Sequence, residues 1–96
     1  MLFQVEMIVS IPHDADPARI DALKAEEKTR AHDLQKSGVW RHLWRHAGQY
    51  RNTSIFDVES NTALHDLLMS LPLYPFMTIS VTPLCRHPSS IHDDDR

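Results

Sequence analysis

The sequence predicts an α+β protein with the element order βαββαβ. Four short segments alternate apolar with polar residues, which is typical of strands with one buried face. Two longer segments carry apolar residues at helical spacing, and each follows a residue that can cap a helix N-terminus. The chain has 96 residues, of which 42% are apolar. This length and composition suit one small domain with a compact core.

The first strand is predicted over residues 2–11, where apolar and polar side chains alternate. Its apolar face is formed by Phe3, Val5, Met7, Val9 and Ile11. The first helix is expected to have Asp16 as its N-cap and Pro17 as its first residue. It is expected to end before Gly38, because glycine tolerates the left-handed conformation that terminates many helices.

The second and third strands are predicted over residues 39–46 and 50–58, with a short hairpin turn between them. Ser60 is expected to cap a second helix, and Pro72 to end it. A fourth strand is predicted over residues 76–82. This order favours a ferredoxin-like fold, in which an antiparallel four-stranded sheet carries both helices on one face.

Residues 1–84 are expected to form the ferredoxin-like domain, and residues 85–96 a C-terminal tail that packs on a neighbouring subunit. The tail has no clear hydrophobic period and ends in an acidic run. Both faces of the second strand are expected to be apolar, because it carries Val39, Trp40, Leu43 and Trp44. A partner subunit is therefore expected to cover the face of the sheet away from the helices.

Charge and cysteine content limit the classes of partner. The net charge is −3 and the basic residues are scattered, which argues against nucleic acid. The single Cys85 fits a reducing compartment. The apolar start is interrupted by Gln4 and Glu6 and lacks a basic region, so we expect no signal peptide. No segment approaches the roughly 20 apolar residues of a membrane span. We expect a soluble cytoplasmic protein.

Glu27 interrupts the apolar pattern of the first helix. At about 100° per residue it falls in the middle of the core-facing stripe, whereas Glu26 falls on the outer face. Burial of a carboxylate is costly unless it is paired, and it raises the pKa toward the range that suits a base near neutral pH. Two interpretations stay open: a catalytic carboxylate, or a structural ion pair with Lys24.

The predicted hairpin carries many groups that can bind an anion or a carbonyl. His42 is expected to lie between Trp40 and Trp44 on one strand face. Arg41 and Arg45 either bind a substrate carboxylate or lie solvated at a strand edge.

The third strand begins with polar residues on one face. Tyr50, Asn52 and Ser54 either form the polar wall of a pocket or mark a hairpin end that emerges into water. No metal site is expected, because His42 and His46 would lie about 13 Å apart along a strand, too far to share an ion.

The whole chain resembles the muconolactone Δ-isomerase family of the catechol branch of the 3-oxoadipate pathway. The matching stretches are MLFQVEM at 1–7, LKAEEK at 23–28, GVWRHLWR at 38–45, GQYRNTSIFDVES at 48–60, LHDLLMSLPLYPFM at 64–77 and LCRHPSSIHDDDR at 84–96. None of them is a general catalytic motif, but together they are specific.

The resemblance implies a ferredoxin-like fold, a ring-like homo-oligomer of decameric type, and no metal or organic cofactor. It implies conversion of (+)-muconolactone to 3-oxoadipate enol-lactone, a proton shift through a dienolate that moves a ring double bond. Given this reaction, Glu27 is expected to be the base. The residues expected to bind the substrate are Lys24, Trp40, His42, Arg45, Tyr50, Asn52 and Ser54.

Two alternatives remain. One is an enzyme of the same family that acts on a chlorinated muconolactone, with loss of chloride after proton abstraction. The other is a non-catalytic ferredoxin-like binding module, in which Glu27 belongs to a structural ion pair.

Overall fold

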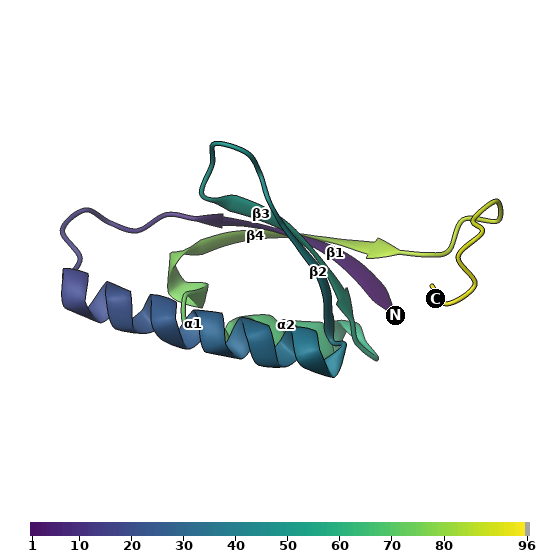
Figure 1. Ribbon diagram of the computed structural model, residues 1–96, viewed down its shortest axis with the longest axis horizontal. Helices are drawn as coiled ribbons and strands as arrows, with labels where there is room; N and C mark the ends of the chain where they lie inside the picture. Colours follow the sequence, from purple (N-terminus) through teal and green to yellow (C-terminus); the bar gives the residue numbers. More distant parts are fainter. Residues whose placement is uncertain (96) are drawn as a thin grey trace.

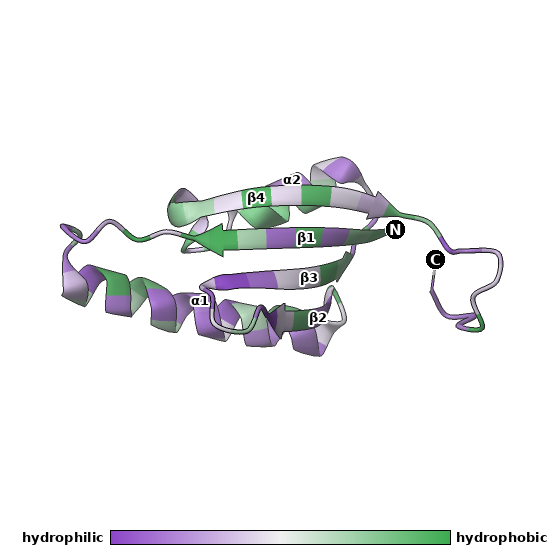
Figure 2. Cartoon of the chain, turned by 90° about the horizontal axis from the view of Figure 1, so that it is seen from above, coloured by the Kyte–Doolittle hydropathy of each residue, from purple (hydrophilic) through white to green (hydrophobic). Residues whose placement is uncertain are grey.

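The structure, a computed structural model, describes residues 1–95 and has the predicted order of elements (Figure 1). The strands are β1 (Leu2–Val9), β2 (Trp40–Arg45), β3 (Arg51–Asp57) and β4 (Met77–Leu84). The helices are α1 (Pro17–Ser37), α2 (Asn61–Met69) and the short 3₁₀ helix η1 (Tyr74–Phe76). The strands form one antiparallel sheet in the order β2-β3-β1-β4, and both α-helices lie against the same face (Figures 1 and 2). The predicted ferredoxin-like α+β fold is confirmed.

The caps of both helices are those expected from the sequence. The Asp16 carboxylate accepts a hydrogen bond from the Ala18 amide at 3.2 Å, and Gly38 ends α1 with φ 87°. The Ser60 hydroxyl accepts one from the Ala63 amide at 3.0 Å. These local signals set the length and start of each helix, and therefore which turn of α1 lies over the sheet.

The limits of the strands differ slightly from the prediction. β4 begins at Met77 because the preceding three residues form η1. It continues to Leu84 through Pro83, which an edge strand tolerates because no further strand needs its missing N–H. β1 stops at Val9, three residues before Pro12.

The core lies between the helices and one face of the sheet. Phe3, Val5 and Met7 of β1 are completely buried, as their alternation predicts. Phe56 of β3 is equally buried beside Phe3. The helices and the segment after α2 close this core with Ala31, Leu64, Leu68 and Leu71.

A β-bulge at Arg41 changes which face the later residues of β2 occupy. Trp40 pairs with Phe56 and turns toward the helices. Beyond the bulge, His42 and Trp44 turn to the outer face of the sheet, where their rings stack at 4.9 Å between centroids. The prediction that His42 shares a face with both tryptophans is wrong, because one extra residue in a strand inverts all later side chains.

The segment 85–95 forms neither helix nor strand and curls back beyond the end of β4 (Figure 1). Arg86 binds Asp93 within this segment at 2.8 Å. Arg41 reaches Asp95 at 3.2 Å and Asp94 at 3.6 Å. The acidic partners in these pairs are exposed to solvent, so the pairs are weak. Packing of the tail on a neighbouring subunit remains a prediction, and its last position, 96, lies outside the described residues.

Over residues 1–95, none of the helices is both long enough and apolar enough to cross a membrane.

Candidate active site

A pocket of about 280 Å³ lies between α1 and the helix-covered face of the sheet. Its polar wall consists of Lys24, Glu27, Lys28, His32, Gln35, Arg45 and Asn52. Its apolar wall consists of Met7, Val9, Ala31, Trp40, Leu43, Leu73 and Met77. A small cavity with an apolar lining and a few converging polar groups is typical of a site for a small molecule.

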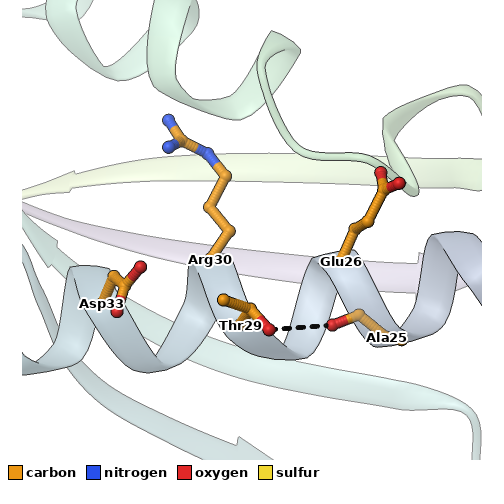
Figure 3. Close-up of a pocket in the computed structure, with 5 residues that line it drawn as sticks. All are labelled: Ala25, Glu26, Thr29, Arg30 and Asp33. Atoms are coloured by element: carbon orange, nitrogen blue, oxygen red, sulfur yellow. Dashed lines mark hydrogen bonds between the residues drawn. The ribbon is translucent and has the colours of Figure 1, made fainter.

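A second, open depression lies on the surface of α1 and is lined by Ala25, Glu26, Thr29, Arg30 and Asp33 (Figure 3). Thr29 donates a hydrogen bond to the Ala25 carbonyl, and Arg30 extends toward α2, where it donates to the Ser70 hydroxyl at 2.6 Å. Glu26 is exposed here, as predicted. This depression is a solvated helix surface that contains no buried carboxylate.

Glu27 is half-buried in the pocket and is held by the turn that follows α2. Its Oε1 accepts a hydrogen bond from the Leu73 backbone N–H at 3.0 Å. Its Oε2 is buried and has no hydrogen-bond partner among residues 1–95. One carboxylate oxygen is therefore held by a hydrogen bond, while the other is unpaired within the described chain.

Burial raises the pKa of Glu27 above its ordinary value of 4.5, against the opposing effects of the Leu73 N–H and the Arg30 guanidinium. A structural ion pair with Lys24 is absent from the described residues, where the recorded ion pairs involve other side chains. The carboxylate thus lies in a site that favours its protonated form more than water does.

Cations line the same pocket. Lys24 and Lys28 come from α1, and Arg45 comes from β2. The Arg45 guanidinium lies 5.7 Å from the centre of the Tyr50 ring and donates a long hydrogen bond to the Gln49 carbonyl at 3.5 Å. Three cations and one carboxylate in the lining of one pocket favour a small ligand that carries negative charge.

The sheet provides two hydrogen-bonding side chains next to these charges. Asn52 lies on the pocket wall, and its Oδ1 accepts a hydrogen bond from the Ser54 hydroxyl at 2.9 Å. Trp40 is 3% exposed and packs on Phe56 with 4.8 Å between ring centroids. Its Nε1 is buried without a hydrogen-bond partner in residues 1–95, so this donor is unsatisfied next to the pocket.

The structure brings together five of the eight site residues predicted from the sequence: Lys24, Glu27, Trp40, Arg45 and Asn52. Ser54 is completely buried beneath the pocket wall. Tyr50 is exposed and lies outside the pocket, where it contacts Arg45. His42 lies on the opposite face of the sheet.

Sequence reasoning missed several residues of the pocket. Lys28 and Gln35 belong to α1, but at about 100° per residue they lie roughly 100° and 80° around the helix from Glu27, so the apolar stripe that singled out Glu27 did not indicate them. The Leu73 amide had no signal in the sequence, because every residue except proline carries a backbone N–H.

The described part of the chain contains no group of three or more His, Cys, Asp or Glu side chains placed to hold a metal ion.

Comparison with known proteins identifies the family. The family model described as muconolactone delta-isomerase matches residues 1–90. The chain is 60% identical to the muconolactone Delta-isomerase of Pseudomonas putida and 59% identical to muconolactone Delta-isomerase 2 of Acinetobacter lwoffii, each over the full length of both chains. A crystal structure titled muconolactone isomerase superposes with a TM-score of 0.94, at 62% identity and full coverage of both chains. The chain belongs to the muconolactone delta-isomerase family.

Proposed function

We propose that this protein is a muconolactone Δ-isomerase, which converts (+)-muconolactone to 3-oxoadipate enol-lactone. The observation that carries the proposal is the half-buried Glu27, which has one free oxygen and a raised pKa in a pocket lined by cations. Isomerisation of this lactone needs one group that removes and returns a proton, and the substrate is a small carboxylate. Full-length identity of about 60% to proteins named for this activity supports the same conclusion.

The proton transfer begins at Glu27. The free Oε2 of the ionised carboxylate removes the proton from the ring carbon that bears the side chain, and the electrons spread toward the lactone carbonyl as a dienolate. The protonated Glu27 then returns the proton to the carbon next to the carbonyl. The double bond moves by one position, and Glu27 ends as a carboxylate. A raised pKa makes both transfers feasible near neutral pH.

Other residues of the pocket hold the anion and stabilise the intermediate. Arg45 and Lys24 are suited to bind the substrate carboxylate. Asn52 and Trp40 can donate hydrogen bonds to the dienolate oxygen. Leu43 and Met77 place apolar groups on the pocket wall, and an apolar surrounding strengthens these electrostatic interactions.

The isomerase is favoured over the two alternatives considered from the sequence. The relatives named above carry the isomerase name rather than that of a dehalogenase. A binding module that uses Glu27 in an ion pair is not favoured, because the carboxylate binds a backbone amide instead. Incubation of the purified protein with (+)-muconolactone and analysis of the product tests the proposal directly. A folded protein that forms no enol-lactone would contradict it.

We also propose that the protein works as a homo-oligomer, of the decameric type that the family resemblance implies, in the cytoplasm. Support comes from the outer face of the sheet, where Trp44 is 55% exposed and Ile8 and Leu84 are each 37% exposed. The chain has a single cysteine, Cys85, and therefore no disulfide of its own, which fits a reducing compartment.

A further inference from the structure

The starting point is an unexpected polar residue in the core. Ser54 is the only polar side chain among residues 1–95 that is fully buried. It lies on the helix-covered face of β3, between Val5 of β1 and Leu43 of β2. A hydroxyl in such apolar surroundings costs stability unless it is hydrogen-bonded, and an alanine would avoid this cost. The pocket wall does not include Ser54, so it does not touch a ligand there.

The Ser54 hydroxyl has one recorded hydrogen bond, which it donates to the Asn52 Oδ1 at 2.9 Å. The two residues are two positions apart and share one face of the strand. If the Asn52 amide were turned over, its nitrogen would face Ser54, and the hydroxyl proton would lose its acceptor within the core. That loss is costly for a buried donor, so Ser54 selects one of the two amide orientations.

This orientation determines what Asn52 presents to the pocket. With Oδ1 directed at Ser54, the Nδ2 group faces the other way. Within residues 1–95 the Nδ2 group donates no hydrogen bond, and it is not buried. It is therefore accessible to a ligand. The cavity between α1 and the sheet is the space that Asn52 lines.

We propose that Ser54 is a positioning residue that holds the Asn52 amide with its Nδ2 hydrogens directed at the dienolate oxygen of the lactone. This inference rests on the proposed isomerase function and assigns the donor for its intermediate. A donor fixed before the reaction stabilises the developing negative charge without reorganisation at that moment. Without Ser54, the last torsion of asparagine has a broad, nearly twofold energy profile, so the amide would often present its oxygen and repel the anion.

The test is a double-mutant cycle in Ser54 and Asn52. Asn52→Ala should lower kcat by about 100-fold or more, as expected for the loss of one donor to an oxyanion, with little change in KM. Ser54→Ala should lower kcat by about tenfold, the effect of one lost hydrogen bond. In the Asn52→Ala background, Ser54→Ala should cause no further loss, because Ser54 acts through Asn52.

Thr53→Ala is the matched control. Thr53 is the residue between the other two on β3, lies on the outer face, and shares a hydrogen bond with His46. This variant also removes one side-chain hydrogen bond from β3, but it leaves Asn52 untouched, so kcat should stay within about twofold of wild type. If Ser54→Ala does not fold, Ser54→Cys keeps the volume with a much weaker donor and should show the same loss.

Three results would overturn the inference. The first is a wild-type kcat in Ser54→Ala or Ser54→Cys, and the second is that Ser54→Ala lowers kcat by the same factor in the wild type and in Asn52→Ala. The third is that Thr53→Ala lowers kcat as much as Ser54→Ala does. Absence of turnover in the wild type would contradict the proposed function instead. In that case NMR would decide the orientation of the Asn52 side-chain amide. Its signals are identified as those that are missing from the spectrum of Asn52→Ala. Its signals should shift in Ser54→Ala and stay in place in Thr53→Ala, and unchanged signals in Ser54→Ala would overturn the orientation.

Discussion

At the scale of single residues, Glu27 shows a conflict between stability and function. Its carboxylate is half-buried with one oxygen unpaired, and burial raises its pKa above 4.5. A group of this kind destabilises the fold at neutral pH, yet it is suited to remove a proton from carbon. Active sites often concentrate such costs, because a well-solvated carboxylate would be a weaker base.

Glu27→Gln is therefore predicted to stabilise the protein at pH 7. The folded state holds the Glu27 proton more tightly than the unfolded chain does, so the wild type loses stability as the pH rises from 4.5 through the folded-state pKa. Glutamine does not titrate, so the advantage of the variant should shrink as the pH falls and vanish below 4.5.

Urea unfolding between pH 4 and pH 8 measures this difference, with the exposed Glu26→Gln as control. Equal pH dependence of Glu27→Gln and Glu26→Gln would show that burial of Glu27 has no energetic effect.

At the scale of elements, α1 carries Glu27 and the turn after α2 orients it. The length of α1 could be predicted, because Asp16, Pro17 and Gly38 act locally at its ends. The inward direction of Glu27 could also be predicted from helical periodicity. The hydrogen bond from Leu73 could not, because it joins residues 46 positions apart through a backbone group.

The faces of β2 show why part of the site could not be predicted. Side chains alternate between the two faces of β2 on either side of Arg41, as a strand pattern predicts. Nothing in the sequence indicates the bulge at Arg41. His42 was therefore placed with Trp40, and the structure separates them. By contrast, Asn52 and Ser54 lie in regular β3, where the period of two places them on the helix-covered face with Phe56.

The end of α1 gives a prediction at this scale. Gly38 has φ 87°, and a Cβ there would meet no atom within 4 Å. Gly38→Ala should thus lower the free energy of unfolding through backbone strain alone, by about 1–2 kcal/mol. Gly38→Asn should lower the free energy of unfolding less than Gly38→Ala does, because asparagine tolerates the left-handed conformation better than alanine. Unfolding at one fixed protein concentration measures both, and wild-type stability in Gly38→Ala would contradict this account.

At the scale of the whole molecule, the two faces of the sheet differ. Helices cover one face, and the other is open in this chain (Figure 2). That open face is mixed: it carries the Arg51–Glu6 ion pair as well as the exposed Trp44 and Ile8. Apolar side chains of this size on a small sheet fit a surface that another subunit covers.

Trp44→Glu is predicted to reduce the oligomer to smaller species, because it places a charge within the proposed contact. Analytical ultracentrifugation measures the assembly, and circular dichroism checks the fold. Met69→Glu is the control, since Met69 is 51% exposed but lies on α2, away from the outer face of the sheet. A monomeric wild type, or an unchanged oligomer in Trp44→Glu, would contradict the proposed interface.

The most direct test of the whole account is turnover of (+)-muconolactone by the wild type, Glu27→Gln and Glu26→Gln side by side. The two glutamates are adjacent on α1, but only Glu27 lines the pocket. We predict enol-lactone formation by the wild type and by Glu26→Gln, and a loss of at least about 100-fold in kcat for folded Glu27→Gln, as expected for removal of a general base. Near wild-type turnover by Glu27→Gln would contradict the account, because the proton would then be moved by another group.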